Sequence, residues 1–168
     1  MTHSDLIEIG RKWLSRPWRT ASREGHGACS VILTDITTSN PETPDVIGWS
    51  GNKCTLIECK TSISDFRADL KKPFRVYPEQ GLGHKRYYLA PRNIIPVNEL
   101  PKGWGLLEAD EGQKVTCICA SALFRSNAHA ETTILLSVLR RVSIIPDKCV
   151  SLRVFTSKTK NRASLTVA

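Results

Sequence analysis

The chain has 168 residues and a formal net charge of +8 at pH 7. Its apolar fraction of 40% and charged fraction of 24% are typical of a globular protein. No apolar run approaches the roughly 20 residues that span a bilayer, which argues against a membrane protein. The first residues, MTHSDLIEIGRKW, lack the apolar centre of a secretory signal, so we expect a cytoplasmic protein without a membrane partner.

The length suits a single domain, which we expect over residues 1–155, followed by a flexible basic tail over residues 156–168. From Arg140 onward there are seven basic residues and one acidic residue, whereas the first 139 residues carry 17 and 15. The tail suits either weak attraction to a polyanion or a solvated end without function. The six cysteines include no Cys-x-x-Cys pair, which favours buried thiols over a zinc or redox site.

Apolar residues recur at helical spacing in residues 4–16, which predicts an amphipathic helix at the start of the chain. A strand is expected over residues 28–37, after which SNPETP forms a turn-rich link. Residues 45–49 and 53–60 then form two strands of a hairpin, joined by Ser50-Gly51-Asn52.

Residues 63–72 predict a second helix, with Ser62 and Asp65 as a start resembling a capping box and Pro73 as its end. The remaining predicted elements are strands over residues 84–91, 104–109 and 114–120 and a helix over residues 130–141. The order helix, three strands, helix, strand predicts an α/β fold. A crossover helix would place the fourth strand parallel to the third, in a mixed sheet flanked by helices.

Three charged residues stand at the ends of the hairpin PDVIGWSGNKCTLIECK, which covers residues 44–60. Because side chains alternate along a strand, Glu58 and Lys60 project from one face, while Ile57 and Cys59 pack into the core. Asp45 begins the antiparallel partner strand, so it should lie close to Glu58. Two adjacent carboxylates repel each other unless one is protonated or a cation lies between them.

Carboxylate oxygens in this arrangement suit Mg²⁺, and an adjacent Lys60 would supply a positive charge for a phosphate. The pattern therefore indicates a site for phosphodiester hydrolysis. The alternative is a surface ion pair between Glu58 and Lys60, with Asp45 in a turn.

Pro44-Asp45, followed after twelve residues by Glu58-Cys59-Lys60, resembles the signature of the PD-(D/E)XK nuclease superfamily. The segments ECKTSISDFRADLKKPFR, GLGHKRYYLAP and LPKGWGLLEAD resemble small bacterial and phage-encoded members, and the resemblance covers about residues 4–141. It implies an αβββαβ core of the restriction-endonuclease type and cleavage of DNA to a 5′-phosphate and a 3′-hydroxyl, in a bacterial cytoplasm. It also implies that Asp45, Glu58 and the backbone carbonyl of Cys59 bind Mg²⁺ or Mn²⁺. Asp45, Glu58 and Lys60 would be the catalytic residues.

Members of this superfamily often add a glutamate from the first helix, and Glu8 is the candidate here. On a helical wheel, however, Glu8 lies opposite the apolar residues, so a solvent-facing position is the alternative. Glu24 and Glu42 are further candidates, the latter because it lies three residues before Asp45.

Basic residues near the predicted site could contact the nucleic-acid backbone. Arg67 and Lys71 share a face of the second predicted helix, and Lys85 and Arg86 begin a strand after a glycine-containing loop. A solvated helix face with local ion pairs is the alternative for the first two. The aromatic residues of these segments are expected to pack in the core: Trp49, Tyr87, Tyr88 and Trp104.

A second function class stays open, in which the nuclease fold binds DNA or a partner protein without cutting. A homodimer or an accessory protein is compatible with either function. The presence of both carboxylates and the lysine favours the active nuclease.

Overall fold

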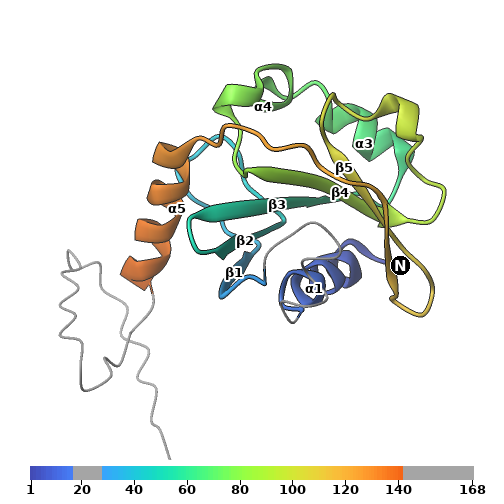
Figure 1. Cartoon of the computed structure of the whole chain (residues 1–168), viewed down its shortest axis with the longest axis horizontal. Helices are drawn as coiled ribbons and strands as arrows, with labels where there is room; N and C mark the ends of the chain where they lie inside the picture. Colours follow the sequence, from blue (N-terminus) through green and yellow to red (C-terminus); the bar gives the residue numbers. More distant parts are fainter. Residues whose placement is uncertain (17–27, 142–168) are drawn as a thin grey trace, which may run out of the picture.

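The structure is a computed structural model that describes residues 1–16 and 28–141. The expected basic tail over residues 156–168, and Glu24, therefore lie outside the described residues. In the described part of the chain, no helix is long and apolar enough to cross a bilayer. The elements in chain order (Figure 1) are α1 (His3–Leu14), β1 (Val31–Thr34), β2 (Val46–Ser50), β3 (Lys53–Cys59), α3 (Ile63–Asp69), α4 (Pro73–Val76), η1 (Pro78–Gln80), β4 (Lys85–Pro91), η2 (Val97–Glu99), β5 (Gly105–Ala109), β6 (Val115–Cys119) and α5 (Ala128–Arg141).

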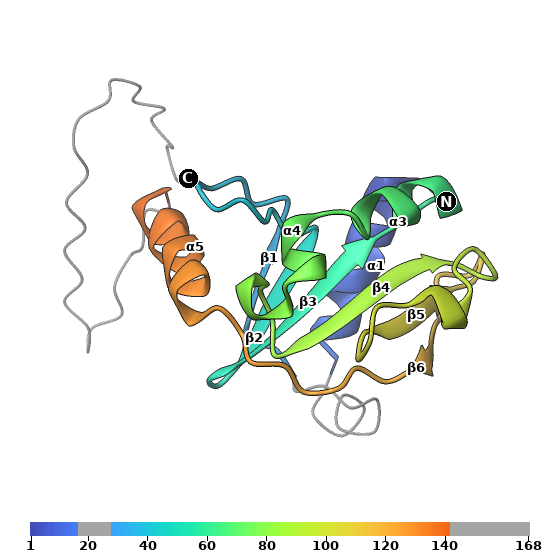
Figure 2. The same ribbon diagram turned by 90° about the horizontal axis from the view of Figure 1, so that it is seen from above.

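The strands form one six-stranded sheet in the order β1-β2-β3-β4-β5-β6. The pairs β3–β4 and β4–β5 are parallel, and the other neighbours are antiparallel. α1 lies on one face of the sheet, and α3 and α4 lie on the opposite face (Figures 1 and 2). The predicted element order, the parallel crossover and the mixed α/β sheet are therefore confirmed.

The central strand β3 is buried on both of its faces. Ile57 and Cys59 belong to the core under α1, whereas Cys54 and Leu56 belong to a second core that includes Phe66 of α3. The sequence had predicted only the first of these two buried faces. The connection between parallel strands crosses over one face of the sheet and covers it. Because β3 and β4 are parallel, α3 and α4 of their connection cover the second face of β3.

Four aromatic residues were expected to pack in the core, and this prediction is confirmed: Trp49, Tyr87, Tyr88 and Trp104 are buried. Cys54 and Cys59 are also fully buried, as expected. Cys117 and Cys119 are instead partly exposed, because β6 is an edge strand of the sheet.

The segment after β3 differs from the single helix expected over residues 63–72. The Ser62 hydroxyl accepts a hydrogen bond from the Asp65 backbone N–H, as the sequence predicted, but α3 ends at Asp69. Pro73 does not end that helix. It begins α4 at a first-turn position, where its missing N–H costs nothing, and Lys72 before it is extended. The break redirects the chain, and α4 carries Arg75 back toward the end of β3.

Candidate active site

Asp45 and Glu58 lie beside each other where β2 begins and β3 ends. Val46 pairs with Ile57 in the antiparallel ladder, so continuation of this register places Asp45 opposite Glu58. The Asp45 Oδ2 atom accepts a hydrogen bond of 2.7 Å from the backbone N–H of Cys59. Asp45 and Glu58 are therefore neighbours, as the hairpin pattern predicted. The Cys59 N–H of β3 holds the Asp45 side chain in place.

Lys60 extends from the end of β3 into a group of carboxylates. Its Nζ lies 3.6 Å from Glu58 Oε2, 3.5 Å from Asp69 Oδ1 and 4.0 Å from Asp65 Oδ1. Glu58 and Lys60 are only 2% and 5% exposed. The alternative of a surface ion pair is therefore wrong, because both side chains are buried.

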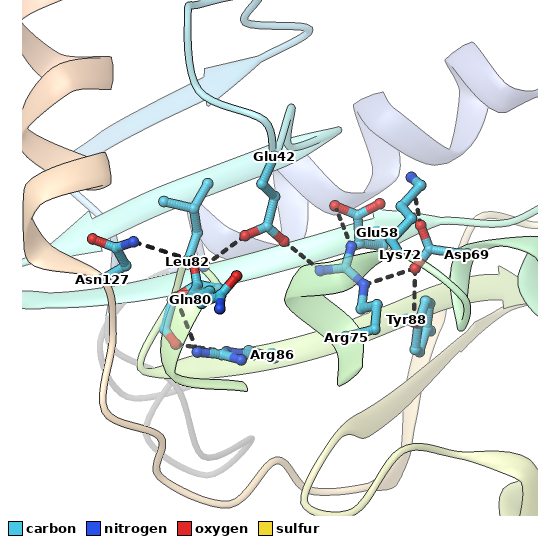
Figure 3. Close-up of polar contacts among 12 residues, drawn as sticks. Glu42, Glu58, Asp69, Lys72, Arg75, Gln80, Leu82, Arg86, Tyr88 and Asn127 are labelled. Carbon is cyan, nitrogen blue, oxygen red and sulfur yellow. Dashed lines mark hydrogen bonds and ion pairs between the residues drawn. The ribbon is translucent and has the colours of Figure 1, made fainter. Parts of the chain in front are cut away.

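Arg75 is the main residue that the sequence did not identify. Its guanidinium forms ion pairs with Glu42, with Glu58 at 3.0 Å and with Asp69 at 2.7 Å (Figure 3). It also packs against two aromatic rings, at 4.7 Å from the centroid of Phe74 and 4.6 Å from that of Trp104. We call Glu42, Glu58, Asp69 and Arg75 the Arg75 cluster. The partners of Arg75 come from three separate segments, so no local pattern in the sequence marks it as a member of this cluster.

Asp69 belongs to the Arg75 cluster and also contacts two lysines, Lys60 and Lys72. Its Oδ2 accepts hydrogen bonds from the Tyr88 hydroxyl at 2.8 Å and from Arg75 Nε at 2.7 Å. Its Oδ1 lies 2.6 Å from Lys72 Nζ and 3.5 Å from Lys60 Nζ. The sequence contained a partial signal, since Asp65 and Asp69 are four residues apart and both lie near Lys60.

The two further candidate acids lie in different places. Glu42 is buried, but its carboxylate binds Arg75 and accepts a hydrogen bond of 2.6 Å from the Leu82 backbone N–H. Glu8 pairs instead with Arg11, at 2.7 Å, and lies 3.7 Å from Lys12 on the outer side of α1. The solvent-facing alternative for Glu8 is thus the one observed.

The first helix reaches the site through His3, at its N-terminal end. His3 begins α1, and its Nε2 lies 3.4 Å from Asp45 Oδ2. A histidine one turn before Glu8 carries no recognisable pattern, which is why only the tertiary structure reveals the contact.

The charges around Glu58 oppose one another. The pKa of Glu58 is raised to about 7, chiefly by burial; Asp45 and Asp69 also raise it, whereas Arg75 and Lys60 lower it. Burial acts to lower the pKa of Lys60, but the surrounding carboxylates, led by Glu58, outweigh it and leave this pKa raised. Burial acts to raise the pKa of Asp69, but Arg75, Lys72 and Lys60 hold it well below its usual value. Lys60 and Asp69 are therefore charged at neutral pH, and Glu58 is the group closest to titration.

The four predicted nucleic-acid contacts have unequal access to solvent. Lys71 is exposed, and Arg67 is exposed but forms a two-bond ion pair with Glu99, at 2.7 and 2.8 Å. The Lys85 ammonium donates to the Ser121 carbonyl at 2.9 Å.

Arg86 is fully buried, so the prediction that it contacts a phosphate is wrong. It donates to the carbonyls of Gly83 and Gly81, at 3.0 and 3.1 Å, and packs on the Phe124 ring. The physical reason is that the loop before β4 and the segment before α5 cover this face of the strand, so the guanidinium meets backbone carbonyls and the Phe124 ring in place of solvent.

The donor atoms at the end of β3 fit a hard divalent cation. Asp45 and Glu58 provide carboxylate oxygens from two adjacent strands, and the buried Glu58 Oε1 makes no hydrogen bond, although Arg75 forms an ion pair with it. Within residues 1–16 and 28–141, no group of three or more His, Cys, Asp or Glu side chains is arranged to hold a metal. The metal ligands expected from the sequence are only two side chains, Asp45 and Glu58, together with the backbone carbonyl of Cys59. They therefore do not form a group of three side chains.

Comparison with solved structures gives a neighbour in fold. The SPO1766 protein of unknown function from Silicibacter pomeroyi is similar, with a TM-score of 0.50 and 23% sequence identity. The match covers 66% of this chain and 75% of that chain. No family model matches the chain, and no curated protein matches it either. The similarity therefore concerns the fold alone.

Proposed function

We propose that this protein is a metal-dependent nuclease that hydrolyses phosphodiester bonds in DNA at the end of β3. The observation that supports the proposal best is the grouping of Asp45, Glu58 and Lys60 at adjacent strand ends. Their arrangement agrees with the PD-(D/E)XK resemblance of the sequence. The six-stranded mixed sheet is compatible with such a core.

Asp45 and Glu58 would hold Mg²⁺ or Mn²⁺, with the Cys59 carbonyl as a further ligand. When bound, the cation supplies an activated water and neutralises negative charge on the phosphate. The Cys59 N–H keeps the Asp45 carboxylate oriented, through its hydrogen bond of 2.7 Å. Lys60 provides a second positive charge 3.6 Å from Glu58, which favours binding of the dianionic transition state.

The test is cleavage of supercoiled plasmid and of labelled single- and double-stranded DNA in Mg²⁺, Mn²⁺ or EDTA. We expect cutting in either metal and none in EDTA. Asp45→Asn keeps an acceptor for the Cys59 N–H but loses the charge, and it should reduce the rate on the order of 100-fold, as should Glu58→Gln. Glu111→Gln makes the same type of change at an exposed residue and should cut like the wild type. Equal rates for all four proteins, or cutting in EDTA, would refute the proposed site.

The second candidate, a nuclease fold that binds DNA or a protein without cutting, is favoured by one observation. The Arg75 guanidinium lies 3.0 Å from Glu58 and already compensates its charge. If this ion pair excludes a metal, the protein should bind DNA in a salt-dependent manner but cut no substrate in any divalent cation. A metal titration monitored by calorimetry separates the two functions, because only the nuclease requires a site that depends on Asp45.

A further inference from the structure

A surface hollow of about 410 Å³ lies next to the Arg75 cluster but contains none of the three proposed catalytic residues. This volume is within the range of pockets that hold small organic ligands. The hollow is lined by Pro41, Thr43, Lys72, Pro73, Phe74 and Gln80.

The walls of this hollow are fixed by the Arg75 cluster. Glu42 lies between the lining residues Pro41 and Thr43, and its carboxylate binds Arg75. Lys72 lies 2.6 Å from Asp69, and the Phe74 ring packs against the Arg75 guanidinium at 4.7 Å. Figure 3 shows Glu42, Lys72 and Glu58 arranged around Arg75. One arginine therefore connects the hollow with Glu58, so a ligand held there would lie beside the proposed reaction site.

The chemistry of the lining matches the parts of a nucleotide. Phe74 and the two proline rings provide apolar surface for the faces of a base. The Thr43 hydroxyl and the Gln80 amide can donate or accept hydrogen bonds from a base edge. Lys72, whose side chain is 46% exposed, provides a cation for a phosphate oxygen.

We propose that this hollow binds one nucleotide of the substrate strand, with its base unpaired. The inference rests on the proposed function, and it adds that the enzyme prefers strands with single-stranded character near the cut. The reason is that bases in a duplex are stacked and paired. An apolar hollow can therefore accept only a base that has left the stack.

The experiment measures the dissociation constant of a labelled oligonucleotide by fluorescence anisotropy, as a single strand and in a blunt duplex of the same sequence. EDTA is present throughout, so that no cutting occurs. Thr43→Trp fills the hollow from an exposed position, and Lys72→Gln removes its cation. We expect each variant to raise the dissociation constant of the single strand at least roughly tenfold while the duplex value stays unchanged. Lys72→Arg should restore most of the binding.

Two matched variants control for bulk and for charge. Thr116→Trp and Lys102→Gln change exposed residues outside the hollow, and both should bind single strands like the wild type. Thermal unfolding by circular dichroism checks that every variant is folded. The proposal is overturned if the single strand and the duplex lose equal affinity. It is also overturned if the losses match those of the controls, or if the wild type binds no single strand.

This result can be told apart from that of the cleavage test. Single-strand binding that depends on Thr43 and Lys72 supports the hollow even if Asp45→Asn cuts like the wild type. Conversely, Asp45-dependent cutting with unchanged binding by Thr43→Trp keeps the nuclease and rejects the hollow. A ribonucleotide strand of the same sequence completes the test. Single-strand binding that depends on Thr43 and Lys72 supports the inference whether the strand is DNA or RNA.

Discussion

Arg75 pairs with three carboxylates that are all buried. Glu42, Glu58 and Asp69 are each at most 3% exposed, and Arg75 itself is 6% exposed. Buried charges of this kind are tolerated only while every partner is present, because an unpaired charge bears its full desolvation cost. The guanidinium suits this position, since its planar fork of five N–H donors directs separate nitrogens at Glu42, Glu58 and Asp69.

Arg75→Met should therefore destabilise the fold strongly. We expect the free energy of unfolding to fall by about 3–5 kcal/mol, the range found when one partner of a buried ion pair is removed. Urea denaturation measures this change. Arg67→Met is the matched control, because Arg67 makes a two-bond pair with Glu99 on the surface, and its loss should cost less than about 1 kcal/mol. Similar losses for both variants would show that the Arg75 cluster has no special role in stability.

Glu58 should make stability depend on pH when no divalent metal is present. Its pKa is raised from an ordinary 4.5 to about 7, chiefly by burial. The folded state thus keeps this proton at a pH where the unfolded state has released it. Stability is full below about pH 4.5 and falls as the pH rises toward 7. The total loss is roughly 3 kcal/mol, at about 1.4 kcal/mol for each pKa unit.

Urea denaturation in EDTA, repeated between pH 4.5 and pH 7, tests this effect of Glu58. The stability of Glu58→Gln relative to the wild type should increase steadily over this interval, since glutamine has no proton to release. A difference that stays constant with pH would show that burial does not perturb this carboxyl group.

Individual site residues were predictable where neighbouring positions in a hairpin determine them. Strand alternation and antiparallel pairing were sufficient to place Glu58, Lys60 and Asp45 together. Glu42 and Asp69, in contrast, meet only through Arg75, which joins a link, a helix and the end of a strand. No local pattern encodes such a meeting. Arg86 was misplaced for a related reason, since strand alternation does not tell whether both faces are covered.

At the scale of elements, the loop between η1 and β4 fits tightly against β3. Gly83 in this loop has a φ of +83°, and a Cβ there would lie 2.8 Å from the Leu56 Cβ and 2.9 Å from the Lys85 carbonyl. Gly51, in the β2–β3 turn, has a φ of +58° with no atom within 4 Å of the added Cβ. Both positions thus have a left-handed backbone that would strain a residue with a Cβ, but only Gly83 lacks the space for that atom.

Gly51→Ala should cost about 1 kcal/mol, from the left-handed conformation alone. Gly83→Ala adds a clash with the core strand, and we expect it to cost at least about 3 kcal/mol. Chemical denaturation of the two variants gives the comparison. Equal costs would mean that the loop moves away from β3 without penalty, in which case it does not fix the position of the strand.

The break between α3 and α4 illustrates what element-level prediction misses. Helical periodicity extends to Lys72, and proline is a helix terminator in most contexts, so the sequence predicts a single helix. Proline is also favoured in the first turn of a helix, and here this second preference applies. The consequence bears on the proposed site, because α4 carries both Phe74 of the hollow and Arg75 of the cluster.

At the scale of the whole molecule, the sequence indicated the order of elements and the mixed sheet because hydrophobic periodicity and crossover rules are local or nearly local. It could not indicate how many faces the helices cover. The structure has two cores, one under α1 and one under α3, and β3 separates them. The proposed site lies at the end of this shared strand, so metal binding there should be coupled to the stability of the whole fold.

This coupling gives the last prediction. A ligand that binds only the folded state stabilises it, by about 1.4 kcal/mol at ten times its dissociation constant. For a chain of this length the unfolding midpoint should rise by roughly 3–6 °C in Mg²⁺ or Mn²⁺. Differential scanning fluorimetry at constant ionic strength measures the shift. Asp45→Asn should lose it, and Glu111→Gln should retain it, since only the first changes a proposed ligand.

Comparing the metal-induced shift of the unfolding midpoint in the wild type and in Asp45→Asn also decides between the two candidate functions, without any substrate. Arg75 and a divalent cation both require the charge of Glu58, so a metal can enter only if Asp45 adds enough affinity to share that carboxylate. A shift that depends on Asp45 means that the site accepts a metal despite Arg75. An identical shift in wild type and Asp45→Asn would place any bound metal elsewhere. No shift at all, at concentrations that support known nucleases, would mean that Arg75 fills the cation position, and the binding module would then be the better account.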